Sequence, residues 1–219
     1  MGNDSKGLER PIIKEDKDEI PKDDPALPIT QVTEYRGLAA RANYLSLDRF
    51  DIQYAAKEAC RDMSTPRISS MSKMKRLARY LLEHPRQVLV FRPCEVVDSP
   101  IVVYTDSDWA GCLRTRKSTS GGMLFFEGGL LKTWSSTQAS VAQSSGEAEY
   151  YALVRACSEA LGMQSVMRDL GWEAKIVVHI DSSAAKSVAS RTGLGKLRHI
   201  EVKFLRAQEF VRFLHNIGR

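Results

Sequence analysis

Apolar residues recur at helical spacing through residues 30–84 of this 219-residue chain. The three apolar stripes comprise Tyr35, Leu38, Ala39, Ala42 and Leu45; Ile52, Ala55, Ala56, Cys60 and Met63; and Ile68, Met71, Met74, Ala78 and Leu81. Offsets of three and four residues are typical of amphipathic helices. Thr65 followed by Pro66 predicts the start of the third helix, and His84 followed by Pro85 predicts its end. The pattern therefore predicts a bundle of three short helices.

After residue 86 the period changes to that of strands separated by turns. Strands are predicted at residues 87–91, 101–106, 122–126, 130–134 and 175–181, and helices at 145–168, from 183 and at 198–214. This order predicts an α/β fold, a mixed five-stranded sheet flanked by helices and preceded by the small bundle. Residues 1–28 are charged, contain four prolines and have no apolar period, which predicts a disordered leader or linker. The expected organisation is thus a leader (1–28), a helical segment (29–85) and a sheet domain (86–219).

The composition, 43% hydrophobic and 27% charged, is that of an ordinary globular protein. The sequence contains no apolar run near the ~20 residues of a membrane span and no apolar signal core, so we expect no membrane partner. Four scattered cysteines without a CxxC pair are typical of reduced thiols in an intracellular protein and give no zinc site. The net charge of +5 fits a polyanionic partner, although a basic protein without such a partner has the same balance.

Acidic residues stand where two apolar strands end. Asp106 ends the segment IVVYTD, and Asp181 ends IVVHID. Strand ends can meet at one edge of a sheet, where ligands commonly bind. For either aspartate taken alone, capping of the next turn or helix is the favoured interpretation.

The predicted helix at 145–168 adds a third acid. Ser144 and Glu147 have capping-box spacing, so Glu147 has a structural role. Glu149 shares a face with Leu153 and Ala156, and a carboxylate on a buried stripe needs a partner such as a metal ion. A first-turn acid favoured by the helix dipole is the alternative for Glu149, and also for Glu201 at the start of the last helix. Together the four acids predict a site of oxygen ligands for two Mg²⁺ or Mn²⁺ ions.

Several motifs resemble, in order, the ribonuclease H domain of copia-type retrotransposon Pol polyproteins. They are YTDSDWAG at 104–111, RKSTSG at 116–121, WSSTQ at 134–138, SGEAEY at 145–150, HIDSSA at 179–184 and RHIE at 198–201. The resemblance implies a ribonuclease H-like fold, with metal-binding catalytic acids at Asp106, Glu149, Asp181 and Glu201. Many relatives have aspartate at the position of Glu201. Periodicity does not separate Asp106 from Asp108, and the resemblance selects Asp106.

Residues 33–91 resemble the segment between polymerase and nuclease in the same polyproteins. The shared pattern includes DIQYA at 51–55 and RLARYL at 76–81, but Phe50 stands where proline is usual. The resemblance implies a helical segment that grips duplex. The polymerase, protease and integrase motifs are absent, which indicates a fragment of a longer element.

These observations predict an intracellular endoribonuclease, in a cytoplasmic particle or the nucleus, that hydrolyses the RNA strand of RNA–DNA hybrids. The polymerase portion of the parent polyprotein is an expected partner. Candidate phosphate contacts are Lys73, Lys75, Arg76, Arg79, Lys117 and Lys196. The basic face of the third helix also fits a merely solvated surface. Two alternatives remain, an inactive nucleic-acid-binding scaffold and a DNA nuclease or transposase of the same fold.

Overall fold

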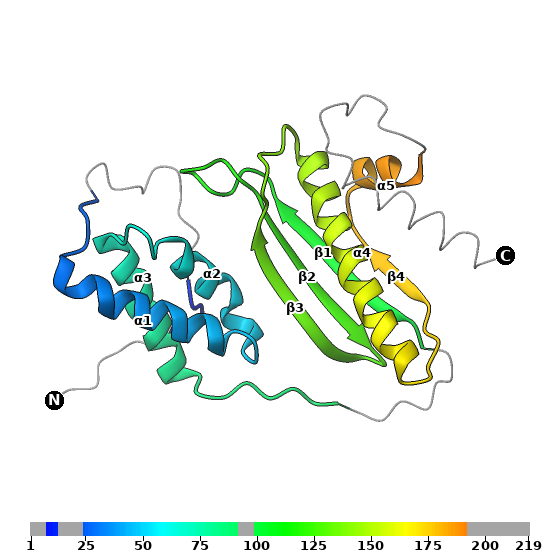
Figure 1. The fold of residues 1–219 in the computed structure, drawn as a ribbon, viewed down its shortest axis with the longest axis horizontal. Coiled ribbons are helices and arrows are strands. Elements are labelled where there is room, and N and C mark those ends of the chain that lie inside the picture. Colours follow the sequence, from blue (N-terminus) through cyan, green and yellow to red (C-terminus); the bar gives the residue numbers. More distant parts are fainter. Residues whose placement is uncertain (1–7, 13–23, 92–98, 192–219) are drawn as a thin grey trace. The chain divides into compact units, whose positions relative to one another are not determined.

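A computed structural model describes residues 8–12, 24–91 and 99–191 of the chain (Figure 1). The chain divides into two compact units, residues 1–88 and 89–219. In the part of the chain that the structure describes, the first contains helices, and the second contains four strands and two helices. We name these the helical unit and the sheet unit.

The helical unit contains the three helices that the apolar pattern predicts. They are α1 (Ile29–Leu45), α2 (Gln53–Arg61), which follows the 3₁₀ turn η1 (Phe50–Ile52), and α3 (Ile68–Glu83). Their apolar faces form one buried core. The stripe on α3 differs from the predicted one, since Leu77 and Tyr80 are buried and Ala78 is exposed. Turning the larger side chains inward buries more apolar surface than Ala78 would.

Residues 24–27 are folded against the start of α3. Leu27 is buried, and Asp24 lies at the first turn of the helix. The carboxylate of Asp24 accepts hydrogen bonds from the backbone N–H of Ser69 (3.1 Å) and from its hydroxyl (2.7 Å). A carboxylate at a helix N-terminus satisfies N–H groups that the helix cannot pair itself. The predicted disordered leader is therefore wrong for these residues.

The same segment moves the start of α3 from its predicted position at Thr65 and Pro66. The N–H of Leu27 donates to the carbonyl of Pro66 (2.9 Å), and the N–H of Ile68 donates to that of Pro25 (3.1 Å). These bonds hold the chain extended until Ile68, where the helix begins. A tertiary contact thus overrides the local signal for a helix start.

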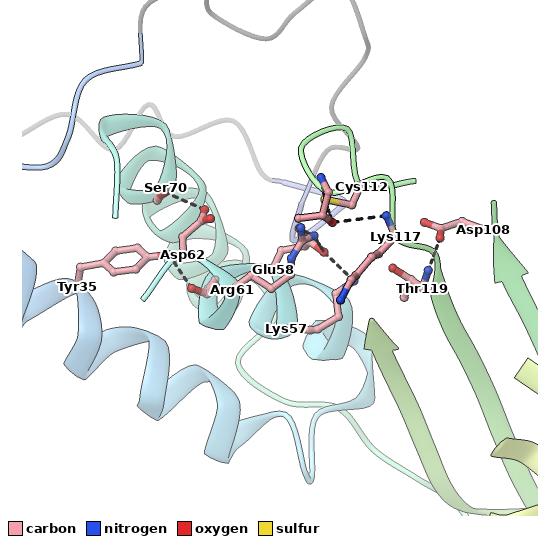
Figure 2. A network of polar contacts seen from close by, with 12 residues as sticks. Tyr35, Lys57, Glu58, Arg61, Asp62, Ser70, Asp108, Cys112, Lys117 and Thr119 are labelled. Atoms are coloured by element: carbon pink, nitrogen blue, oxygen red, sulfur yellow. Dashed lines mark hydrogen bonds and ion pairs between the residues drawn. The ribbon is translucent and has the colours of Figure 1, made fainter. Parts of the chain in front are cut away.

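Acidic side chains of the helical unit are paired with nearby donors. Asp62 accepts a hydrogen bond from the hydroxyl of Ser70 (2.9 Å), and Glu58 forms an ion pair with Arg61 (2.9 Å), as Figure 2 shows. Burial opposes the ionisation of Glu58, but Lys57 and Arg61 outweigh it and lower the pKa of its carboxyl. Asp62 and Glu58 therefore have compensating partners.

A second polar cluster ties η1 to α3. Both oxygens of the Asp51 carboxylate accept hydrogen bonds from Arg49, at 2.9 and 2.7 Å, and the hydroxyl of Tyr80 donates to the same carboxylate at 2.9 Å. Burial opposes the ionisation of Asp51, but the hydrogen bonds from Arg49 and Tyr80 outweigh it, so its pKa lies below the ordinary value. Bidentate pairing of this kind fixes geometry as well as charge.

The sheet unit has a mixed sheet with strand order β3-β2-β1-β4. Its strands are β1 (Ile101–Asp108), β2 (Thr119–Phe126), β3 (Gly129–Thr137) and β4 (Ile176–His179). The first three form an antiparallel meander, and β4 pairs with β1 in parallel. The fold is α/β, and this arrangement is compatible with the ribonuclease H-like architecture predicted above.

The predicted strand at residues 87–91 is absent, so the described residues form four strands rather than five. These residues have no strand pairing, and Val88, Val90 and Phe91 are exposed. The segment lies at the division between the two units. A short apolar run is not a strand unless a sheet edge is available to pair with its backbone groups.

Helix α4 (Ser145–Asp169) lies along one face of the sheet, and α5 (Ser183–Ser190) follows β4 (Figure 1). Buried alanines on α4, including Ala152, Ala156 and Ala160, let the helix approach the sheet closely. The hydroxyl of Thr105 on β1 donates to the carbonyl of Gly121 on β2 at 2.9 Å. Among the described helices, none is both long and apolar enough to cross a membrane. The packing brings the end of β1 beside the first turns of α4.

We expect Tyr80→Phe to lower the free energy of unfolding of the helical unit by about 1.5 kcal/mol, because a donor to the charged Asp51 is lost. Denaturant titration of the full chain, followed by circular dichroism, measures this change. Tyr44→Phe is the control, since Tyr44 is exposed. Because the pKa of Asp51 is lower in the folded protein than in the unfolded chain, its ionised carboxylate stabilises the fold above pH 3.8. This stabilisation is lost as the pH falls through the lower pKa of the folded protein. The Tyr80→Phe difference should therefore shrink below pH 3.8, and a pH-independent difference would contradict the assignment.

Candidate metal centre

Asp106 in β1 and Asp181, two residues beyond the end of β4, occupy equivalent positions relative to the parallel pairing of these strands. The last paired residues of β1 and β4 are Tyr104 and His179, whose rings stack with centroids 4.7 Å apart. Asp106 comes two residues after Tyr104, and Asp181 comes two residues after His179. Because parallel strands end at the same edge of a sheet, both aspartates emerge there together. Both are exposed.

Asp108, which sequence periodicity does not separate from Asp106, has a different environment. Its carboxylate accepts a hydrogen bond from the backbone N–H of Thr119, the first residue of β2 (Figure 2). It also lies over Gly111, where any Cβ would collide with the carboxylate. Asp108 therefore closes the connection between β1 and β2, and Asp106 faces the other acids.

Glu147 and Glu149 on α4 have the separate roles that helix geometry predicts. The hydroxyl of Ser144 accepts a hydrogen bond from the N–H of Glu147 (3.2 Å) and caps the helix. The Glu147 carboxylate is buried and accepts hydrogen bonds from the N–H of Gln143 (2.9 Å) and the hydroxyl of Tyr151. Glu147 is thus a structural acid, and its bond to Tyr151 has no signal in the capping pattern.

Glu149 completes a cluster of three acids. One carboxylate oxygen from each of Asp106, Glu149 and Asp181 lies within 4.8 Å of the others. We name these residues the acidic cluster. The backbone N–H of Ser107 donates to Asp106 Oδ1 (2.8 Å) and to Glu149 Oε1 (3.3 Å). The other oxygen, Oε2, is buried and accepts no hydrogen bond from the described residues.

The electrostatic environment disfavours a negative charge on Glu149. Burial, followed by the charges of Asp106 and Asp181, raises its pKa from 4.5 to about 7. A buried carboxylate oxygen without a donor, beside two further carboxylates, is a strong acceptor for a cation. The donor set consists of carboxylate oxygens, which suit hard ions such as Mg²⁺ or Mn²⁺. The residues present therefore fit a divalent cation.

The remaining predicted site residues fall into three groups. Glu201 and Lys196 lie outside the described residues. Lys117 is half-buried in the connection between β1 and β2. On α3, Lys75 and Arg79 are exposed, as a phosphate contact requires, whereas Lys73 and Arg76 are half-buried.

Gln138 contacts Ser107 and Ala148, the neighbours in sequence of Asp106 and Glu149, and the residue patterns predicted no role for it. Its side chain is buried immediately after β3 and donates hydrogen bonds toward β1, β2 and α4. Apolar periodicity gives no signal for such a residue, since it follows the strand and its partners are distant in sequence. Its position in the segment 134–138 that resembles a retrotransposon motif is the one signal available.

Comparison with known proteins relates the chain to retrotransposon polyproteins. It is 31% identical over 143 residues to the Retrovirus-related Pol polyprotein from transposon RE1 of Arabidopsis thaliana, covering 65% of this chain and 10% of that protein. It is 30% identical over 165 residues to the Retrovirus-related Pol polyprotein from transposon TNT 1-94 of Nicotiana tabacum, covering 74% and 12%. No protein-family model matches.

A shorter match joins the chain to a differently named protein. It is 40% identical over 88 residues to Secreted RxLR effector protein 161 of Plasmopara viticola, covering 40% of this chain and 61% of that protein. The chain spans about a tenth of the length of the two Pol polyproteins above. It is therefore similar to one segment of a retrotransposon Pol polyprotein.

We expect the stability of the metal-free sheet unit to fall as pH rises from 4.5 to about 7, because Glu149 must ionise in the folded protein at higher pH than in the unfolded chain. Glu149→Gln should remove this loss and stabilise the unit at pH 8 by about 1–2 kcal/mol, allowing for solvent screening. Thermal unfolding with a metal chelator measures both. Glu159→Gln on the same helix, which removes an ion pair with Lys132, is the control and should retain the pH slope. An unchanged slope in Glu149→Gln would refute the assignment.

Proposed function

We propose that this chain contains a metal-dependent nuclease domain that hydrolyses the RNA strand of RNA–DNA hybrids. The observation that carries the proposal is the acidic cluster, with one oxygen of each acid within 4.8 Å of the others and a buried oxygen of Glu149 without a hydrogen-bond donor among the described residues. Similarity to one segment of Pol polyproteins supports a role within a retrotransposon polyprotein. The motifs that contain these acids favour ribonuclease H among the activities of such a polyprotein.

Asp106, Glu149 and Asp181 would hold Mg²⁺ or Mn²⁺, with Glu201 as a further ligand outside the described residues. Two such ions, when bound, activate water and stabilise the leaving oxygen of a phosphodiester. The protein would bring its carboxylates together at the sheet edge, and the N–H of Ser107 would orient Asp106 and Glu149 by donating to both. Near neutral pH, Glu149 carries a proton for part of the time, and cation binding releases it.

Nucleic-acid binding would rest on backbone contacts. Lys75 and Arg79 are four residues apart on α3 and exposed, so both can reach phosphates from one helix face. Lys73 and Arg76, with Lys117 and Lys196, remain candidate contacts. A hybrid would be recognised by its shape and 2′-hydroxyls rather than by its base sequence. The polymerase portion of the parent polyprotein would be the protein partner.

We expect Asp106→Asn and Asp181→Asn each to reduce hybrid cleavage at least about 100-fold, about 2.7 kcal/mol of transition-state stabilisation. The amide keeps the shape of the side chain and removes the charge that holds cations. Asp108→Asn is the matched control, because Asp108 lies two residues from Asp106 and binds Thr119 instead. Labelled hybrid is incubated with each protein in Mg²⁺ and in Mn²⁺, and binding is measured separately in Ca²⁺.

The same assay separates the alternatives. A wild-type protein that binds hybrid in Ca²⁺ but never cuts it would support the scaffold function instead. Preferential cutting of duplex DNA would support a DNA nuclease. Cleavage by Asp106→Asn at the wild-type rate would exclude the acidic cluster as the catalytic centre.

We expect Lys75→Ala with Arg79→Ala to reduce the slope of log affinity against log salt by roughly 0.7–0.9 for each lost phosphate contact. The control is Lys132→Ala with Arg155→Ala, which removes the same charge from residues that are both paired with Glu159. Fluorescence anisotropy of labelled hybrid in Ca²⁺ gives the slopes. Equal slopes for the Lys75/Arg79 variant and the wild type would show that α3 presents only a solvated face.

A further inference from the structure

We propose that Gln138 is a positioning residue for the acidic cluster, holding the end of β1 and the first turns of α4 at the separation where Asp106 and Glu149 share one donor. Its Nε2 lies 2.8 Å from the carbonyl of Ala148, 2.9 Å from the hydroxyl of Ser120 and 3.2 Å from the hydroxyl of Ser107. These partners belong to α4, β2 and β1, so one side-chain amide joins three elements.

Two of these partners adjoin the acids in sequence. Ser107 follows Asp106, and its N–H is the donor that Asp106 and Glu149 share. Ala148 precedes Glu149. A shift of either backbone segment would therefore move a carboxylate of the cluster.

The cluster needs such a restraint because its members repel one another. Like charges within a few ångströms repel more strongly when they are partly removed from water. The restraint must come from groups that do not touch the carboxylates and that are rigid themselves. Gln138 meets this requirement, since it is buried and its own N–H donates to the carbonyl of Ser118 at 2.8 Å.

Gln164 provides a matched comparison within the same unit. Its Nε2 donates to the carbonyl of Ala174 at 2.8 Å, a bond of the same type and length as that from Gln138 to Ala148. It lies fifteen residues along α4 from Glu149. A general loss of stability should follow from replacing either glutamine, whereas a loss of positioning should follow only at Gln138.

The test compares Gln138→Met with Gln164→Met in the full chain. Two quantities are measured without nucleic acid, Mn²⁺ affinity by calorimetry and the hydrogen-exchange rate of the Ser107 amide by NMR in metal-free protein. We expect Gln138→Met to weaken Mn²⁺ binding about tenfold, the lower end for residues that support metal ligands. It should also accelerate Ser107 exchange. Gln164→Met, which loses one bond of the same type as the bond from Gln138 to Ala148, should retain wild-type values of both.

The two readouts separate this inference from the proposed function on which its metal-binding part rests. Wild-type protein without Mn²⁺ affinity would overturn the metal site, yet faster Ser107 exchange in Gln138→Met alone would still support positioning. Unchanged exchange and affinity in Gln138→Met would overturn the inference. Should this variant fail to fold, Ser107→Ala removes the contact of Gln138 to β1 together with the 3.3 Å bond from the same hydroxyl to the carbonyl of Asp108, and Ser120→Ala removes the contact to β2. Faster exchange of the residue 107 amide is expected in both. Exchange at the wild-type rate would count against positioning.

Discussion

The contacts of the sheet unit hold three carboxylates close together at one edge of its sheet, against their mutual repulsion. One oxygen of each of Asp106, Glu149 and Asp181 lies within 4.8 Å of the others, and burial of Glu149, followed by the charges of the two aspartates, raises its pKa to about 7. A fold keeps such an arrangement only when the surrounding contacts outweigh its electrostatic cost. Parallel pairing of β1 with β4 and the close packing of α4 supply those contacts.

Other acids of the chain show how an isolated carboxylate is ordinarily satisfied. Asp51 accepts hydrogen bonds from Arg49 and Tyr80, and Glu147 accepts them from Gln143 and Tyr151. Glu149 instead receives one long bond from a backbone N–H that it shares with Asp106. This contrast points to a ligand for Glu149, since the protein satisfies comparable acids with its own donors.

Two further acids near the sheet edge, Asp108 and Glu147, stabilise the backbone and do not belong to the acidic cluster. Asp108 joins β1 to the start of β2, and Glu147 completes the start of α4. They hold the backbone on either side of the cluster while Asp106 and Glu149 remain directed toward one another. The two glutamates differ because their side chains leave the helix in different directions. Asp106 and Asp108 share a face of the strand and differ in the partners that each carboxylate meets.

The sequence alone determined the elements whose signal is local. Helical spacing predicted α1, α2 and α4, strand composition predicted the paired strands, and capping chemistry assigned Glu147 to the start of α4. Strand-terminal positions and a buried helix face also selected Asp106, Glu149 and Asp181 as candidates, although Asp106 was separated from Asp108 only by family resemblance. Local patterns work here because side-chain direction repeats with the backbone period.

The tertiary structure decided what depends on partners distant in the chain. Residues 87–91 have strand composition but pair with no strand of the described residues. Residues 24–27 have the composition of a leader, but Asp24 caps the start of α3 and Ala26 forms a β-bridge with Arg67. Gln138 has a polar side chain, yet this side chain is buried, because Ala148, Ser120 and Ser107 supply hydrogen-bond partners for its amide. Hydrogen bonds between distant segments require a register that no local period encodes, so only the folded chain reveals them.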